Sequence, residues 1–319
     1  MSLSRPHAMV TIDGRRLSSA EAALVRVTVT LSLGGGHDPA ELILWPTSKF
    51  AGSAPGSKMS IALGDAGAEE DVWAGEVTEV AAGADGVIVA GLAGTLALSR
   101  SRVSRGYLDQ TVSDIATDLA GSVTIDQVAG DQSLSAYAVD DRRSVWAQLL
   151  DLGRLIGAEP SSSPSGGLRF VLPRTGTPDF KLRYGAEILS WSGGSGTAAD
   201  VPGVVAYGAA SQAGADQWHW ILKNPGGGGA AGGSLRTLGA LRTQDVADAM
   251  TQALTDRAAR GAVHGTLRIV GRAGIRAGDL VQATGLPTGD PGTLRVRTVE
   301  HVLDSRVGFV TTLTVEGAG

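Results

Sequence analysis

The 319-residue sequence contains no cysteine, which excludes disulfide bridges, cysteine-based zinc sites and thiol nucleophiles. Aromatic residues make up only 4% of the chain, and charged residues make up 18%, against about a quarter in an average protein. The formal net charge is -5, and the pI is near 5.6. This balance lacks the basic footprint of nucleic-acid-binding proteins and of polybasic membrane-binding segments. We therefore expect no specific nucleic-acid binding.

Long apolar runs are also missing. The longest extends from Val87 to Leu98, and it is too short and too interrupted to cross a bilayer. The N-terminal residues lack the apolar core of a signal peptide. The sequence thus predicts a protein that is made in the cytoplasm and is not inserted into a membrane.

Glycine, in contrast, is abundant, with 46 residues, which is about twice the ordinary usage. Many glycines and few aromatic residues indicate many turns and thin packing, so we expect stabilisation by neighbouring subunits. The chain is nevertheless 43% hydrophobic and long enough for two or three domains with a real core.

The first hundred residues have the pattern of short β-strands. Residues 24–33 alternate, with valines and leucines on one face. Residues 72–80 and 87–92 form a predicted hairpin. Short strands separated by regular turn signals favour a small barrel or sandwich, and we assign residues 1–104 to a first β-barrel domain.

Helical spacing appears in the region that we assign to an α/β middle domain, residues 105–176. Its central stretch runs from Asp141 to Val171 and contains a helix with Ser144 as N-cap and Gly157 as the closing residue. A second helix is predicted to begin at Thr111 and to end at Gly121.

β-strand patterns return in residues 177–215 and 262–319, which we assign to a second β-barrel domain. Between them, residues 216–261 are predicted to be an insertion made of a Gly-rich loop and a helix that starts at Thr243 and ends at Gly261. The predicted fold class is therefore mainly β with α (α+β). Two small related barrels are joined by an α/β middle domain, with a helical insertion in the second barrel.

The two β regions share an order of parts. In each, a strand leads through a glycine-containing or acidic loop to a second strand, and after a turn to a third; the two segments are residues 58–92 and 276–315. We predict that they are diverged copies of one unit. The alternative is that unrelated β-meanders look alike at this level, and the strand order in space distinguishes the two.

No constellation of catalytic or metal-binding residues is present. The five histidines are scattered singly, without a partner at metal-ligand spacing. The acidic groups 69–71 and 140–141 resemble solvated turns more than acid–base pairs, and no serine lies in a nucleophile elbow. We expect no catalytic residue, no cofactor and no metal. An enzyme would have to use Glu70, Asp71 or Asp140.

Two further stretches favour contacts over chemistry. Trp218 and Trp220 alternate along a predicted strand, which favours core or subunit packing over a sugar-binding platform. We expect them at a subunit interface, together with the glycines of the adjacent loop: Gly226, Gly227, Gly228 and Gly229. The basic segment 99–105 is interpreted as a solvated linker or interface.

An ordered set of motifs resembles the phage late control protein D family. These proteins are the baseplate hubs of contractile tails and are similar to the hub part of type VI secretion spike proteins. The segments that carry the resemblance are Trp73–Val80, Arg105–Ala116, Ser144–Leu150, Leu155–Glu159, Gly167–Phe170, Arg276–Val281, Gly292, Val299–Val302 and Gly308–Leu313.

The resemblance implies a homotrimeric ring in which two related barrels per chain adapt a sixfold tail tube to a threefold spike. The implied partners are a tail tube protein, baseplate wedge proteins and a spike. Because the sequence ends at Gly319, directly after the last predicted strand, the spike is expected to be a separate chain. The expected location is a phage tail or a phage-tail-like particle. The alternative function is a cell-wall or carbohydrate-binding module of a tail-associated or secreted protein.

Overall fold

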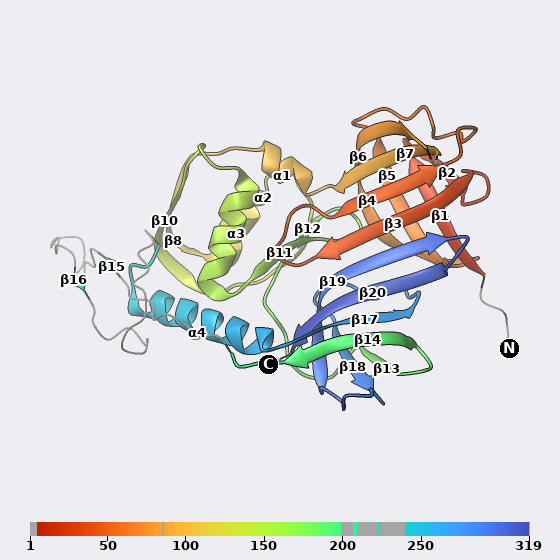
Figure 1. Ribbon diagram of the computed structural model, residues 1–319. Coiled ribbons are helices and arrows are strands. Elements are labelled where there is room, and N and C mark those ends of the chain that lie inside the picture. The colour runs from red at the N-terminus through yellow and green to blue at the C-terminus, as the bar shows by residue number, and fades with distance from the viewer. Residues whose placement is uncertain (1–4, 85, 199–206, 209–221, 224–239, 319) are drawn as a thin grey trace.

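The computed structural model describes residues 5–84, 86–198, 207–208, 222–223 and 240–318. Figure 1 shows three parts: two β units lie side by side, and a mixed part that contains the short helices lies next to both of them. We call these parts unit 1, unit 2 and the middle domain.

Unit 1 is formed by the first strands of the chain. Its longest inward-facing alternation is in β3, where Val27, Val29 and Leu31 are buried and the residues between them are partly exposed, as the sequence pattern predicted. The strands are β1 (Pro6–Ile12), β2 (Arg15–Ser18), β3 (Leu24–Ser32), β4 (Pro39–Leu44), β5 (Lys58–Asp65), β6 (Ala68–Gly83) and β7 (Gly86–Ala93).

Unit 2 combines two strands from before residue 196 with four from the C-terminal part of the chain. These strands are β13 (Phe180–Arg183), β14 (Ile188–Ser195), β17 (Val263–Val270), β18 (Leu280–Thr284), β19 (Thr293–Asp304) and β20 (Gly308–Gly317). Two short strands, β15 (Tyr207–Gly208) and β16 (Leu222–Lys223), pair with each other in the segment between β14 and β17.

The two units have the same strand order in space. Unit 1 is ordered β1-β5-β6-β7-β4-β3, with β2 outside β1, and unit 2 is ordered β13-β18-β19-β20-β17-β14. The strands also follow one another along the chain in the same sequence. One direction differs, because β1 runs antiparallel to β5 whereas β13 runs parallel to β18. A shared order of six strands supports the predicted internal duplication.

The hydrogen-bonding registers agree as well. The β6–β7 pair has a bulge between Val77 and Glu79, and the β19–β20 pair has one between Val296 and Thr298. Each bulge follows the third residue pair, counted from Gly75 and from Leu294 at the open ends of the hairpins. The β3–β4 and β14–β17 pairs are likewise both irregular two residues into the strand, after Leu24 and Ile188. Bulges tend to be retained in related sheets because each shifts the facing of the residues that follow.

The units are joined edge to edge. β3 of unit 1 pairs antiparallel with the second half of β19, from Ser32 opposite Thr298 to Arg26 opposite Asp304. This pairing makes one 13-stranded sheet out of both units. Their apolar side chains form one continuous hydrophobic core, which includes Val29 and Val299. We call the β3–β19 pairing the intrachain seam.

The middle domain lies between the units in sequence and beside them in space (Figure 1). Its central helix begins at the N-cap Ser144, whose side chain accepts a hydrogen bond from the Ala147 N–H, and ends at Gly157 in the left-handed conformation, as predicted. Thr111 caps the other predicted helix through the Asp114 N–H. The elements are α1 (Leu96–Arg100), β8 (Arg105–Thr111), α2 (Val112–Ala120), β9 (Ile125–Val128), β10 (Ser133–Val139), α3 (Val145–Ile156), β11 (Glu159–Ser162) and β12 (Leu168–Val171).

The helix of the predicted insertion, α4 (Gln244–Gly261), has N-cap Thr243 as expected. It follows β14 and precedes β17, but its buried residues Val246, Ala247 and Met250 belong to the hydrophobic core of the middle domain. In Figure 1, α4 runs beneath α3. An insertion between two strands of unit 2 therefore completes the core of another part.

Two local interpretations of the sequence were wrong. The sequence predicts no strand directly ahead of the helix that begins at Thr111, but the segment that begins at Arg105 forms β8 and pairs with β10. The acidic residues 69–71 were interpreted as a turn, but they lie within β6 and pair with β5. β8 pairs with a strand that lies beyond helix α2, and residues 69–71 pair across a tight hairpin, so in both segments polar side chains lie on strands.

Candidate functional site

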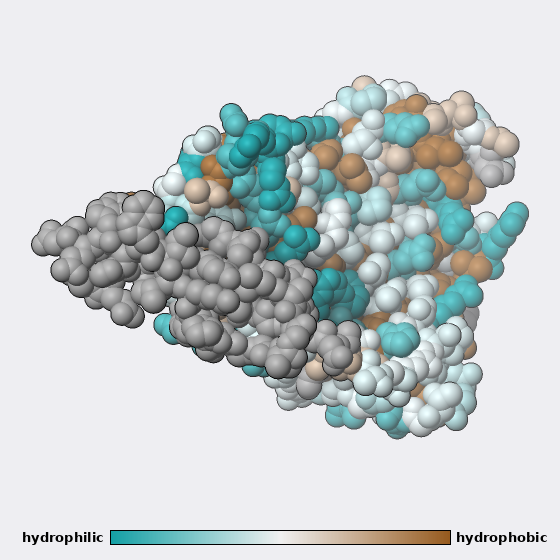
Figure 2. Space-filling view, turned by 60° about the vertical axis from the view of Figure 1, so that its left-hand side comes forward, coloured by the Kyte–Doolittle hydropathy of each residue, from teal (hydrophilic) through white to brown (hydrophobic). Residues whose placement is uncertain are grey.

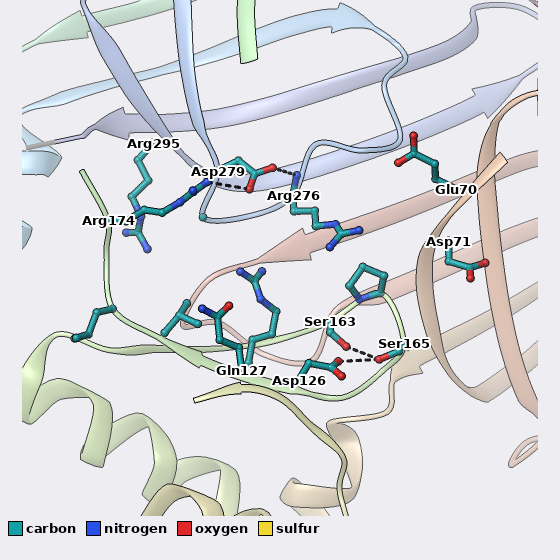
Figure 3. Close-up of a pocket in the computed structure, with 15 residues that line it drawn as sticks. Glu70, Asp71, Asp126, Gln127, Ser163, Ser165, Arg174, Arg276, Asp279 and Arg295 are labelled. Atoms are coloured by element: carbon teal, nitrogen blue, oxygen red, sulfur yellow. Dashed lines mark hydrogen bonds and ion pairs between the residues drawn. The ribbon is translucent and has the colours of Figure 1, made fainter. Parts of the chain in front are cut away.

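A cleft of about 830 Å³ lies where the three parts meet. Glu70 and Asp71 reach it from unit 1, Asp126 and Ser163 from the middle domain, and Arg276 from unit 2. Figure 3 shows this arrangement, with the labelled side chains arriving on separate ribbons. We call it the junction cleft.

The polar side chains of the junction cleft are engaged mainly with one another and with nearby backbone groups. Arg174 lies 3.5 Å from Asp279 and also pairs with Asp179. Asp279 accepts a 2.8 Å hydrogen bond from the backbone N–H of Arg276. Burial raises the pKa of Asp279, and this backbone donor opposes the shift. These contacts fix the turn that precedes β18.

On the opposite wall of the cleft, two serine hydroxyls form a short hydrogen-bonded chain that ends at the carboxylate of Asp126. Ser163 and Ser165 are 2.8 Å apart, and the Ser165 hydroxyl donates to Asp126 at 2.7 Å (Figure 3). The residues that line the cleft are carboxylates, arginines, serines, one glutamine and small or apolar residues, with no histidine, lysine or tyrosine among them. The serine pair contacts the carboxylate of Asp126, and the lining holds no imidazole or amine that would be a stronger base for a serine nucleophile.

A buried charge cluster lies against the cleft and ties its walls together. Arg295 of β19 is only 1% exposed and donates to Glu159 of β11 at 2.5 Å and to Glu316 of β20 at 2.9 Å. Arg297 pairs with the same two glutamates. Arg260, near the end of α4, lies 3.5 Å from Glu316. We call these five residues the charge cluster.

The charge cluster holds three arginines and two glutamates, so it carries one excess positive charge. Burial alone would raise the pKa of Glu159, but the guanidinium groups of Arg295 and Arg297 outweigh it and hold that pKa below its ordinary value. Burial lowers the pKa of Arg260, against the attraction of Glu316. Glu159 therefore stays ionised and connects β11 of the middle domain with β19 of unit 2.

The predicted acidic candidates are not brought together. Glu70 and Asp71 are neighbours on one strand, and Figure 3 shows their carboxylates pointing in different directions. Asp140 lies elsewhere, in the loop before α3, where its side chain pairs with Arg142 at 2.9 Å. Trp218, Trp220 and the range 226–229 lie outside the described residues.

The described histidines are also separate. His7 lies 2.5 Å from Glu69, and His37 contacts the hydroxyls of Thr95 and Ser99. His301 is fully buried in unit 2. Within the described parts of the chain, no group of three or more acidic or histidine side chains is placed to hold a metal ion.

The side of the molecule shown in Figure 2 has no broad apolar face. On the side that Figure 2 shows, hydrophobic residues lie in small groups between hydrophilic ones. The large exposed apolar side chains come from different elements: Trp45, Leu108, Leu172, Tyr184, Leu189, Val270 and Val307. Nor is any helix in the described ranges both long and apolar enough to cross a membrane.

Sequence reasoning missed the charge cluster. Its one local signal is that Arg295 and Arg297 interrupt an otherwise apolar run in a predicted strand. Their partner Glu159 is more than a hundred positions away in the chain. Charged residues are rarely buried unless paired, but the pairing depends on contacts that no local pattern encodes.

No model of a known protein family matches the sequence, and no curated protein matches it. Solved structures do match. A tail protein from Neisseria meningitidis MC58 superposes with a TM-score of 0.72 at 14% identity, over 98% of this chain and 96% of that one. The 43 kDa tail protein of prophage MuSo2 from Shewanella oneidensis gives 0.72 at 13% identity, over 98% and 99%. The chain has the fold of these tail proteins.

The tail-protein fold extends to a secretion component. An E. coli protein described as a component of the type VI secretion system, with structural similarity to the T4 bacteriophage tail proteins gp27 and gp5, matches with a TM-score of 0.62 at 11% identity. That match covers 96% of this chain and 76% of the other. At such low identity the likeness is one of fold, and it extends over nearly the whole of this chain.

Proposed function

We propose that this protein is the structural hub of a contractile tail or contractile injection system, a member of the late control protein D group. Three copies form a ring that adapts a sixfold tube to a threefold spike. The observation that carries the proposal is the internal repeat. Two units with the same strand order and the same bulges lie edge to edge in one sheet, so three chains supply six similar positions.

The role is mechanical and not enzymatic. Buried ion pairs hold the middle domain against unit 2 beside the junction cleft, and the lining of the cleft holds no imidazole or amine to activate its serines. A rigid connection of this kind suits a component that must keep its shape while a tube is assembled on it. The fold shared with tail proteins over nearly the whole chain supports the same role.

The proposed partners are a tail tube protein, a spike protein and the baseplate wedge proteins. The proposed site of action is a phage tail or a phage-tail-like particle assembled from chains made in the cytoplasm. Trp218, Trp220 and Gly226–Gly229 remain predicted subunit contacts, and we expect Trp218→Ala and Trp220→Ala to weaken the trimer.

Light scattering on the purified chain, combined with electron microscopy of negatively stained particles, tests this function. A hub gives three times the chain mass and ring-shaped particles, and it co-purifies with the tube protein encoded with it. A sedimentation assay with peptidoglycan tests the carbohydrate-binding alternative. A monomer that forms no ring with the tube protein and sediments with peptidoglycan would overturn the hub function.

A further inference from the structure

The internal repeat assigns an equivalent to each strand of the intrachain seam. β3 has the place in unit 1 that β14 has in unit 2, since each is the last strand of its order. β6 has the place in unit 1 that β19 has in unit 2, since each is the long strand between the meander's outer strands. The equivalent of the β3–β19 pairing is therefore a pairing of β14 with β6. These two strands are not neighbours in the sheet of a single chain.

The seam exists because β19 extends beyond its neighbour. β18 pairs with β19 only as far as Leu280 opposite Arg295, and β3 then takes over the same edge from Thr298 onward. The β20 side of β19 is occupied along its whole length. The long strand thus presents a free half-edge, and a strand from the other unit fills it.

β6 presents the same half-edge. Its pairing with β5 starts at Lys58 opposite Glu76, and the loop residues before β5 bond to the backbone of Val77. From residue 78 to Gly83, β7 covers one edge of β6. No strand in the described parts of the chain covers the other.

β14 has the complementary free edge. It pairs with β17 on one side, and within the described residues no strand pairs with it on the other. Its residues are largely exposed and include no charged side chain. Exposed edges are ordinarily protected by charges, as in β2, which carries Arg15 and Arg16, and in β13, which carries Lys181 and Arg183.

We propose that β14 of one copy pairs antiparallel with the free half of β6 in a second copy, so that the intrachain seam is repeated between chains. This interface rests on the proposed ring of three. When the bulges of the two units are aligned, Ala81 and Gly83 of β6 correspond to Glu300 and Val302 of β19. Gly194 and Ser192 of β14 likewise correspond to Thr30 and Thr28 of β3. Because Glu300 pairs with Thr30 and Val302 with Thr28 in the intrachain seam, Ala81 is placed opposite Gly194 and Gly83 opposite Ser192. Main-chain hydrogen bonds then provide much of the contact, as in other pairings of exposed strand edges.

The absence of cysteine makes this register directly testable. The variant Ala81→Cys with Gly194→Cys places one thiol on each proposed partner strand, and a side chain at residue 194 meets no atom within 4 Å. A disulfide forms only if the two Cβ atoms approach to about 3.5–4.5 Å. The matched control is Ala82→Cys with Gly194→Cys, since neighbouring residues on a strand point to opposite faces.

After mild oxidation, a non-reducing denaturing gel should show dimers and trimers of the 81/194 variant, with the ladder ending at three chains. The 82/194 control should stay mostly single. Mixing the two single-cysteine variants should give dimers and no trimer. Circular dichroism of the reduced variants verifies that each is folded.

The outcomes separate the two proposals. If light scattering shows a trimer but the folded 81/194 variant gives no more cross-linked product than the control, the seam is wrong and the hub function stands. If the chain is a monomer and gives no cross-link, both are wrong. A ladder that continues past three chains supports the strand pairing but contradicts the closed ring.

Discussion

Arg295 and Glu159 are 136 positions apart in the chain and only 2.5 Å apart in the fold. One belongs to the long strand of unit 2 and the other to the first strand after α3. Arg295 also pairs with Glu316, and Glu159 also pairs with Arg297. The ion pairs of Glu159 hold the middle domain against unit 2.

Glu159→Gln is expected to destabilise the protein strongly. The change keeps the shape of the side chain but leaves three buried or half-buried arginines with one carboxylate. Breaking a buried ion pair by removing one partner costs ~3–5 kcal/mol. Urea unfolding followed by circular dichroism measures the loss, and Asp140→Asn, in an exposed pair with Arg142, should cause no measurable change.

Arg297→Met tests the charge cluster by removing a basic residue in place of an acidic one. It removes the excess positive charge and leaves two arginines for two glutamates, so it should destabilise the protein less than Glu159→Gln does. The same unfolding measurement decides. A larger loss for Arg297→Met would mean that the balance of charge is not what stabilises the cluster.

His301 should make the protein less stable in acid. Burial lowers the pKa of His301 to about 4, from an ordinary 6.5. Its contribution is therefore fully present above pH 6.5 and is lost as the pH falls toward 4, because the unfolded chain takes up the proton first. His301→Gln should lose less unfolding free energy between pH 6.5 and 4.5 than the wild type. The exposed control His264→Gln should follow the wild-type curve.

Asp38, unlike His301, should make the protein less stable as the pH rises. Burial raises the pKa of Asp38 to about 7, from 3.8, although Ser32 donates two hydrogen bonds to the carboxylate. The folded state binds the proton more tightly, so this contribution is present below pH 3.8 and is lost as the pH rises to 7. Asp38→Asn should therefore gain stability relative to the wild type as the pH rises from 4.5 to 7.5. Equal pH curves for the two proteins would contradict it, and the exposed control Asp131→Asn should show no gain.

Met250→Ala tests whether α4 belongs to the core of the middle domain. Met250 is 1% exposed and packs in the same cluster as Leu149 of α3. Truncating a buried methionine typically costs ~2–5 kcal/mol. Hydrogen exchange should become faster in α3 than in unit 2, whereas the exposed control Arg257→Ala leaves both unchanged. Faster exchange confined to β17 would assign α4 to unit 2 instead.

Local elements were predictable where local chemistry decides them. The helix from Ser144 to Gly157 has a hydroxyl that accepts from a free helical N–H and a glycine that closes the last turn, and both are visible in sequence. The strand from Arg105 to Thr111 was not predictable, because its polar residues become a strand only through pairing with β10.

The sequence by itself determined the class of the fold and most of its elements. It also predicted that two β regions repeat, although only the strand order in space distinguished a repeat from two unrelated meanders. The tertiary structure decided the rest: the edge-to-edge seam, the docking of α4 on a part far from it in sequence, and the buried pairing of Glu159 with Arg295. Each of these depends on which surfaces meet after collapse, and residues that meet across a hundred positions leave no periodic trace along the chain.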